Sequence, residues 1–468
     1  MDLVDRTAAD LAGMVRRREV SARELLAAHL ARIERVNPTL NAIVTLVPEM
    51  AEAWADAADE QTASGAELGP LHGLPIAHKD LELTAGIRTT FGSPLYADFV
   101  PDEDGLIVQR LRAAGAVTIG KTNTPEGGAG SQTFNPIFGA TRNPYDPAKT
   151  CGGSSGGAAV ALAAGMIPIA DGSDMGGSLR NPASFCNVVG LRPSPGRVPS
   201  WPNKTPWSPL STGGAMGRCV ADVALQMQAI CGPDVRNPLS LPDTGSVFAA
   251  RLDRDVTGFR VAWSPDLGLP VEPAVRSALA HVPDQLAALG CEVSEAMPNL
   301  GDADEIFQTL RAWHFEVNSG ADYDRAAHLM KDTIRWNIEE ARRRTLVDHA
   351  RASAAHERLL GRVRRFFERF DVLALPVSQV APFDVELDWP RHVDGQPMET
   401  YIDWMRSCCD VTVMGCPAMS VPAGFTPDGL PVGVQFVGPP NCDFELLQFG
   451  YAFEQATRVG DRRPLLPS

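Results

Sequence analysis

Residues 152–165 read GGSSGGAAVALAAG, in which four glycines bracket two serines and a run of small apolar residues follows. The apolar run is typical of a buried helix or strand. Three uses fit such a loop. Its free N–H groups can bind a phosphate at a helix start, the segment Gly152–Gly156 matches the nucleophile elbow G-x-S-x-G, or the glycines only let a helix pack closely.

Short β-forming runs alternate with helical runs on both sides of this loop. The alternation predicts an α/β fold with a large mixed, partly parallel central sheet covered by helices on both faces. No internal repeat interrupts it, and residues 1–468 are expected to form a single domain. Two amphipathic helices are predicted between Thr7 and Val36, the second with a capping box of Ser21 and Glu24. The other predictions are strands at 73–77, 117–119, 167–170, 258–264, 291–293, 372–375 and 418–421, and helices at 105–114 and 274–290.

Residues 320–370 differ from this alternation because they are almost continuously helical and charged. Two interpretations are open for this helical insertion. It is either a cap over a functional site or a solvated outer pair of helices.

The composition excludes several classes of partner. A net charge of −15 disfavours nucleic acid and anionic membranes, which repel an acidic surface. Nine cysteines without a C-x-x-C pair, and an N-terminus that does not resemble a secretory leader, favour the cytoplasm. The nine histidines form no metal-binding pattern, so no metal and no other cofactor is expected.

Two motif matches are contradicted by their context. Gly115–Thr122 satisfies the phosphate-loop pattern G-x-x-x-x-G-K-[ST], but its middle is a β-forming run and Pro125 blocks a following helix. The elbow at Gly152–Gly156 needs an acid and then a histidine downstream, and no downstream histidine stands in a glycine-rich loop.

A different set of polar residues remains. A second glycine-framed serine, Ser178, lies in GSDMGGSLRNP at 172–182, and Lys79 ends the apolar stretch LHGLPIAHKD at 71–80. A lysine buried against apolar residues loses its charge and can act as a base. Such a lysine can activate a serine hydroxyl without any histidine.

At this point the chain resembles the amidase signature family along nearly its whole length. The motifs that carry the resemblance are GLPIAHKD, GKTNTPE, ATRNPYD at 140–146, CGGSSGG, GSDMGGSLRNPASFCNVVGLRP at 172–193 and PAMSVPAGFTPDGLPVGVQFVG at 417–438. So many motifs in one order do not match by chance. The resemblance implies the amidase signature fold.

The resemblance also implies the roles of individual residues. Ser178 is expected to be the nucleophile, Ser154 the bridging residue and Lys79 the base, with a cis peptide bond between Gly153 and Ser154. The expected oxyanion hole consists of the N–H groups of Met175, Gly176, Gly177 and Ser178. The remaining expectations are supporting roles for Asp174, Arg180 and Ser155, and substrate contacts for Gly130, Ser131 and Gln132.

The expected activity is hydrolysis of a carboxylic amide through an acyl-enzyme. Two positions differ from the family pattern: Gly127 replaces an aromatic residue and Thr412 replaces an asparagine, which puts the substrate in doubt. Aromatic residues such as Trp201 and Trp336 favour a bulky, neutral or aryl amide, with esters and carbamates open to the same chemistry. The alternative is the glutaminase subunit of a tRNA-dependent amidotransferase. The expected partner is a small-molecule amide, and the expected state is a monomer or homodimer.

Overall fold

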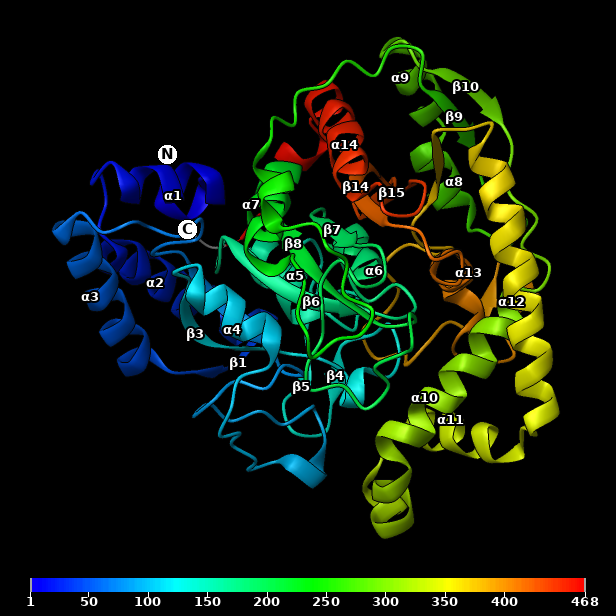
Figure 1. Ribbon diagram of the computed structural model, residues 1–468, viewed down its shortest axis with the longest axis horizontal. Helices are drawn as coiled ribbons and strands as arrows, with labels where there is room; N and C mark the ends of the chain where they lie inside the picture. Colours follow the sequence, from blue (N-terminus) through cyan, green and yellow to red (C-terminus); the bar gives the residue numbers. More distant parts are fainter. Residues whose placement is uncertain (1, 467–468) are drawn as a thin grey trace.

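The computed structural model describes residues 2–466, which build a continuous 11-stranded sheet (Figure 1). The strand order is β1-β3-β2-β6-β8-β7-β14-β15-β11-β9-β10. The strands in this sheet are β1 Ile43–Leu46, β2 Pro75–Lys79, β3 Val117–Thr122, β6 Ile169–Asp174, β7 Val189–Arg192, β8 Thr212–Gly217, β9 Arg260–Trp263, β10 Glu292–Glu295, β11 Val372–Pro376, β14 Ala418–Phe425 and β15 Pro431–Val437. Two small hairpins lie outside it: β4 Phe134–Asn135 with β5 Gly139–Ala140, and β12 His392–Val393 with β13 Gln396–Pro397.

The sheet is mixed. Strand β2 pairs in parallel with β3 and β6, and β9 pairs in parallel with β10 and β11. The strands between these two parallel parts, β8, β7, β14 and β15, pair antiparallel. The predicted fold class, a partly parallel mixed sheet, is therefore confirmed.

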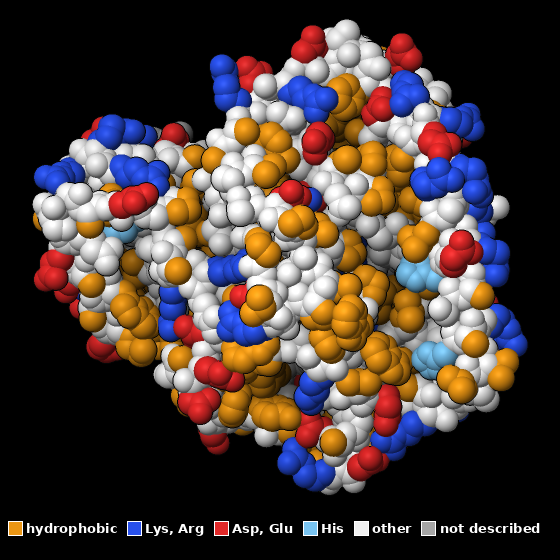
Figure 2. All heavy atoms as spheres, viewed as in Figure 1, with side chains coloured by type: hydrophobic (Ala, Val, Ile, Leu, Met, Phe, Trp, Pro, Cys, Tyr) orange, Lys and Arg blue, Asp and Glu red, His pale blue; other side chains and the backbone are white. Residues whose placement is uncertain are grey.

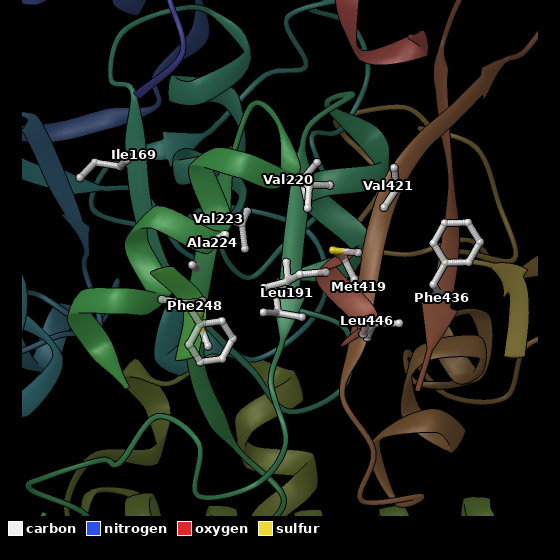
Figure 3. Packing of buried hydrophobic residues seen from close by; sticks show 14 of the residues in the cluster. Ile169, Leu191, Val220, Val223, Ala224, Phe248, Met419, Val421, Phe436 and Leu446 are labelled. Carbon is white, nitrogen blue, oxygen red and sulfur yellow. The ribbon is translucent and has the colours of Figure 1, made fainter. Parts of the chain in front are cut away.

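Helices cover both faces of the sheet. One core cluster contains residues of α1, α4, α7, α8, α9 and α14, and Figure 3 shows part of it. The opposite face packs against α2, α3 and α5 near β1, and against α10, α12 and α13 near β10. The helices are α1 Ala8–Arg16, α2 Ala22–Leu40, α3 Pro48–Ser64, α4 Leu106–Ala113, α5 Gly156–Ala163, α6 Arg180–Phe185, α7 Val220–Ile230, α8 Pro273–Leu279, α9 Val282–Ala288, α10 Ala303–Ala326, α11 Asp332–Arg343, α12 Leu346–Phe367, α13 Arg406–Thr412 and α14 Asp443–Thr457.

The strand residues follow the period of two that a sheet buried on both faces requires. Leu373 and Leu375 of β11 pack into one cluster, whereas Val372 and Ala374 pack into the other. Both sets are apolar because helices cover both sides. Such strands appear in the sequence as unbroken apolar runs.

The predicted N-terminal helices are confirmed with their caps. Helix α1 begins after Thr7, whose side chain accepts a hydrogen bond from Asp10 N–H. Helix α2 begins after Ser21, which forms the expected capping box with Glu24. Each cap satisfies a backbone donor that the first helical turn leaves without a partner.

The predicted strands all occur, with ends shifted by a few residues, but β1, β7, β8 and β15 were not predicted. Strand β8 reads TGGAMG, and its three glycines do not have the β-branched composition typical of a strand. Strand β3 continues through Gly120 to Thr122, so the phosphate-loop match lies on a strand, as its context indicated.

The charged helical region begins earlier than expected. Helix α10 starts at Ala303, and α10, α11 and α12 together form the right-hand edge of the molecule in Figure 1. Within residues 2–466 no helix is both long enough and apolar enough to cross a membrane.

Candidate active site

The first turn of α5, which continues the glycine loop, is packed so tightly that side chains would not fit. A Cβ at Gly156 would lie 2.2 Å from Thr133 Oγ1, and one at Gly157 would lie 2.4 Å from Asn123 N. Every residue of α5 is buried. The glycines are therefore needed for close approach, and they hold the two serines against the sheet.

Lys79 lies at the carboxyl end of β2, and its side chain is fully buried. Its amine nitrogen lies 2.8 Å from Ser154 Oγ, 2.9 Å from Ser155 Oγ and 3.1 Å from Ser173 Oγ. The structure thus brings together the expected base and the expected bridging serine. The peptide bond between Gly153 and Ser154 is cis, as the resemblance implied.

The surroundings of this amine shift its equilibrium toward the neutral form. Burial lowers the pKa of Lys79 to about 8, although the charge of Glu82 opposes that shift. A neutral amine has two N–H donors and one lone pair. The Ser155 hydroxyl donates to the Ser173 carbonyl, so its oxygen is free to accept from Lys79. Since Ser154 Oγ has no other partner within residues 2–466, its hydroxyl can donate to the lone pair.

Ser178 follows β6 in the second glycine loop and is partly exposed, whereas Ser154 is 3% exposed. The two loops are joined because Ser155 N–H donates to the Ser178 carbonyl at 3.1 Å. In the described part of the chain the Ser178 hydroxyl itself has no hydrogen-bond partner. Catalytic hydrogen bonds are often long without substrate. The Ser178 hydroxyl is therefore partly exposed and without a partner in the described chain, on a loop that a backbone hydrogen bond joins to the loop of Ser154.

The backbone N–H groups of the second loop are not equivalent. Gly177 N–H donates to Asp174 Oδ1 at 2.9 Å. The N–H groups of Met175, Gly176 and Ser178 have no acceptor among residues 2–466. Three of the four expected oxyanion donors are therefore free, and the fourth holds the loop to Asp174.

Asp174 and Arg180 form a buried bidentate ion pair. Asp174 Oδ1 lies 2.8 Å from Arg180 Nη2, and Oδ2 lies 3.0 Å from Arg180 Nε. Burial opposes the charged form of Asp174, but the Arg180 guanidinium outweighs it and holds the pKa of Asp174 well below its usual range. Arg180 also donates to Thr412 Oγ1 at 2.9 Å, so the residue that departs from the family pattern supports this pair.

The three expected substrate contacts lie beside the glycine loop. Ser131 Oγ donates to the Gly153 carbonyl at 2.6 Å, and Gln132 Nε2 donates to the carbonyl of Val385 at 3.0 Å. A Cβ at Gly130 would lie 3.6 Å from Lys331 Nζ. These contacts are structural, and substrate binding by the three residues stays a prediction.

Sequence reasoning missed Asp171 and His78. Asp171 Oδ1 accepts from Lys79 N–H at 2.7 Å, and Oδ2 is hydrogen-bonded to His78 Nδ1. These bonds fix the end of β2 that carries Lys79. The available signal was an acidic residue directly after the apolar part of β6, because a buried carboxylate in a strand needs partners.

A cavity of about 530 Å³ opens beside this site. Ser173, whose hydroxyl contacts the Lys79 amine, lines the cavity. Within the described chain, neither Ser154 nor Ser178 is among the lining residues. Gly127 also lines it, and a Cβ there would lie 3.2 Å from Ile334 of α11. Figure 2 shows hydrophobic side chains gathered at the lower centre of this face, where α10 and α11 approach the loops that follow β2.

The described residues contain no group of three or more His, Cys, Asp or Glu side chains placed to hold a metal ion. The groups that the two glycine loops and β2 bring together are hydroxyls, an amine and backbone N–H groups.

Known proteins are similar to this chain in sequence and in fold. The profile of the Amidase family matches residues 24–447. The acylamidase of Rhodococcus erythropolis is 36% identical over 468 residues, covering 98% of this chain and 97% of that protein. A glutamyl-tRNA(Gln) amidotransferase subunit of Synechococcus sp. (strain CC9605) is also 36% identical, with 99% of each chain covered.

A solved structure agrees with the sequence comparisons. A bacterial aryl acylamidase of the amidase signature family superimposes with a TM-score of 0.90 and 26% identity, covering 98% of this chain and 99% of that one. The family match spans most of the chain, and relatives that hydrolyse amides cover nearly all of it. This chain therefore belongs to the amidase signature family and is an amide-hydrolysing enzyme.

Proposed function

We propose that the protein is an amidase that hydrolyses bulky neutral or aryl amides through the triad Lys79, Ser154 and Ser178. The observation that carries this proposal is the buried Lys79 amine, 2.8 Å from Ser154 Oγ. In the neutral form it accepts the Ser154 proton, Ser154 accepts the proton of Ser178, and Ser178 Oγ attacks the amide carbonyl. The result is a tetrahedral intermediate with a negatively charged oxygen.

The second glycine loop is proposed to stabilise that oxygen. The N–H groups of Met175, Gly176 and Ser178 are free to donate, and the loss of one such donor typically costs about 3 kcal/mol of transition-state stabilisation. Gly177 N–H can donate to the same oxygen only if it divides its hydrogen bond between that oxygen and Asp174 Oδ1. In this proposal Asp174 and Arg180 keep the loop in place.

The proton then returns to the leaving amine through Ser154, and water hydrolyses the acyl-enzyme by the same relay. Esters and carbamates are open to the same attack. An ester needs less help from the relay, because an alkoxide leaves more readily than an unprotonated amine.

The cavity favours a bulky substrate over glutamine. Its volume of about 530 Å³ lies in the range of sites for drug-sized ligands. Phe91, Phe99 and Trp201 line it, whereas Trp207 is exposed and Trp336 does not line it within the described residues.

The alternative, a glutaminase component of a tRNA-dependent amidotransferase, is favoured by the equal identity to the Synechococcus amidotransferase chain.

The remaining expectations become part of the proposal. We infer a single catalytic unit in which the helical region caps the site, since His314 and Asn318 of α10 and Ile334 of α11 line the cavity. All nine cysteines are free thiols, which supports a cytoplasmic enzyme. We also propose that the protein is a monomer or homodimer. Its partner is a small-molecule amide, and it binds neither nucleic acid nor a membrane.

The test is a substrate panel on the purified chain. Anilides, short amides, aryl esters, carbamates and glutamine are compared by kcat/KM, with Ser178→Ala as the blank. We expect anilides and aryl esters to be cleaved. Release of ammonia from glutamine with no anilide cleavage would instead support the amidotransferase alternative.

A further inference from the structure

Glu82 is the carboxylate of the cavity that lacks a partner. Three acidic residues line the cavity. Glu126 accepts a hydrogen bond from the Ser93 hydroxyl at 2.9 Å, and Asp322 accepts one from the Tyr96 hydroxyl at 2.7 Å. Within residues 2–466, the Glu82 carboxylate has neither a hydrogen bond nor an ion pair. A carboxylate facing a cavity without a partner is a position that can receive one from a ligand.

The backbone fixes Glu82 beside the catalytic lysine. Glu82 N–H donates to the Lys79 carbonyl at 2.8 Å, and Lys121 Nζ donates to the Glu82 carbonyl. A Cβ at Gly105 would lie 3.7 Å from Glu82 Oε2. The backbone of Glu82 is therefore held by hydrogen bonds on both sides, and its carboxylate lies near Gly105.

The rest of the cavity lining combines aromatic rings with uncharged polar side chains and offers little positive charge. The rings of Phe91 and Phe99 are stacked, with centroids 6.0 Å apart. Lys204 donates to the Asn318 carbonyl at 3.1 Å. Burial lowers the pKa of His314 to about 4, so that ring is neutral at physiological pH. The cavity thus combines aromatic walls with a single unpaired carboxylate.

We propose that Glu82 is a specificity residue that selects amide substrates carrying a protonated amine on an aryl or other apolar group. This inference rests on the proposed amidase function and names its substrate class. The ammonium group donates to the Glu82 carboxylate, and the apolar part of the substrate packs on the aromatic walls. A hydrogen bond between charged groups is the stronger kind, so it discriminates against neutral isosteres.

The charges around Glu82 give this recognition a pH dependence. Burial and the charge of Asp171 raise the pKa of Glu82 to about 7, while Lys121 and Lys79 act in the opposite direction. The partnered acids Glu126 and Asp322 share the cavity. Below pH 7 the carboxyl is mostly protonated and the preference for a cation weakens.

Binding of small probes tests the proposal without requiring turnover. Benzylammonium and benzyl alcohol, which differ in one charged group, are titrated calorimetrically into the wild-type protein, Glu82→Gln and Asp322→Asn. At pH 8.5 we expect the wild type to prefer benzylammonium by about tenfold or more. The preference should shrink at pH 6, disappear in Glu82→Gln and persist in Asp322→Asn, which removes a partnered carboxylate from the same cavity.

Several results would overturn the proposal. They are equal affinity for the two probes at pH 8.5, no measurable binding of benzylammonium, or a preference that Glu82→Gln leaves unchanged. These outcomes are separate from a failure of the proposed function, which is judged by amide turnover and its loss in Ser178→Ala. A protein that cleaves anilides and binds both probes equally would keep the function and lose the inference.

Discussion

Two buried lysines lie on neighbouring parallel strands, and only one of them is proposed to act as a base. Lys79 ends β2, and Lys121 lies on β3, which pairs with it. Both side chains are fully buried, and burial lowers both pKa values to about 8. Each amine contacts hydroxyl groups. Burial and basicity are therefore shared and do not distinguish the two residues.

The partners of the two amines do distinguish them. Lys121 Nζ donates to the Glu82 carbonyl, to Thr84 Oγ1 at 2.8 Å and to Thr89 Oγ1 at 3.1 Å. These groups belong to one loop that the lysine holds in place. Lys79 instead contacts Ser154 and Ser155 of the first glycine loop and Ser173 near the end of β6, and Ser173 lines the cavity. Desolvation makes a lysine a base. The base can take part in catalysis only if it exchanges protons with hydroxyls close to the substrate.

The largest effect is expected from the hydroxyl that only the Lys79 side possesses. Ser178→Ala should lower anilide turnover by at least about 10⁴-fold, because it removes the oxygen that is proposed to attack the amide carbonyl. Thr84→Ala removes a hydroxyl from Lys121 and serves as the matched control. Steady-state kinetics on both variants decides, and substantial turnover by Ser178→Ala would refute the assignment.

Exchanging each lysine for methionine sharpens the contrast. Lys79→Met should lose about 10²–10⁴-fold in amide cleavage, and less in ester cleavage. Lys121→Met should mainly destabilise the fold, by about 1–3 kcal/mol, because it leaves buried oxygens without a donor. Amide and ester kinetics together with urea unfolding separate the two. Equal losses on amide and ester in Lys79→Met would argue against proton return to the leaving amine.

The support of the oxyanion loop belongs to the Lys79 side alone. Asp174→Asn should destabilise the protein by about 3–5 kcal/mol, because it leaves the buried Arg180 charge uncompensated and weakens the bond to Gly177 N–H. Urea unfolding at neutral pH measures this loss. A variant as stable as the wild type would show that the ion pair contributes nothing to the fold.

The smallest expected effect is a shift in pH dependence. Only neutral Lys79 can accept a proton, so amide kcat/KM should rise with pH through the lysine pKa of about 8. The negative charge of Glu82 raises that pKa. Glu82→Gln should therefore move the acid limb to lower pH, while Thr84→Ala should leave it unchanged. A limb that moves upward in Glu82→Gln would contradict the sign of this interaction.

Several residues of the site could be predicted from the sequence, because their neighbours along the chain indicate their chemistry. Ser154 and Ser178 stand among glycines, and Lys79 ends an apolar run, so residue type and neighbours point to the chemistry. The roles of Asp171 and His78 were not readable in this way. A polar residue in an apolar strand shows that a partner exists, but the partner lies on another strand.

The same distinction holds for the strands of the fold. Strands such as β11 and β14 were predicted from apolar, β-branched runs, although β1 and β15 were missed despite such runs. The glycine-rich β8 was missed because its place depends on β6 and β7 on either side. Glycine patterns indicated a loop with close contacts. They did not reveal that Gly177 N–H is committed to Asp174, which needs the loop and the ion pair in three dimensions.

The sequence by itself determined the alternation of strands and helices, the family and the three expected triad residues, since these depend on residue types and on order along the chain. Only the tertiary structure decided which buried lysine faces reachable hydroxyls, which N–H groups remain free and which cavity carboxylate has no partner. Those properties depend on distances between segments far apart in the chain. Solvent exclusion and hydrogen bonding act on such distances, and they exist only once the sheet has assembled.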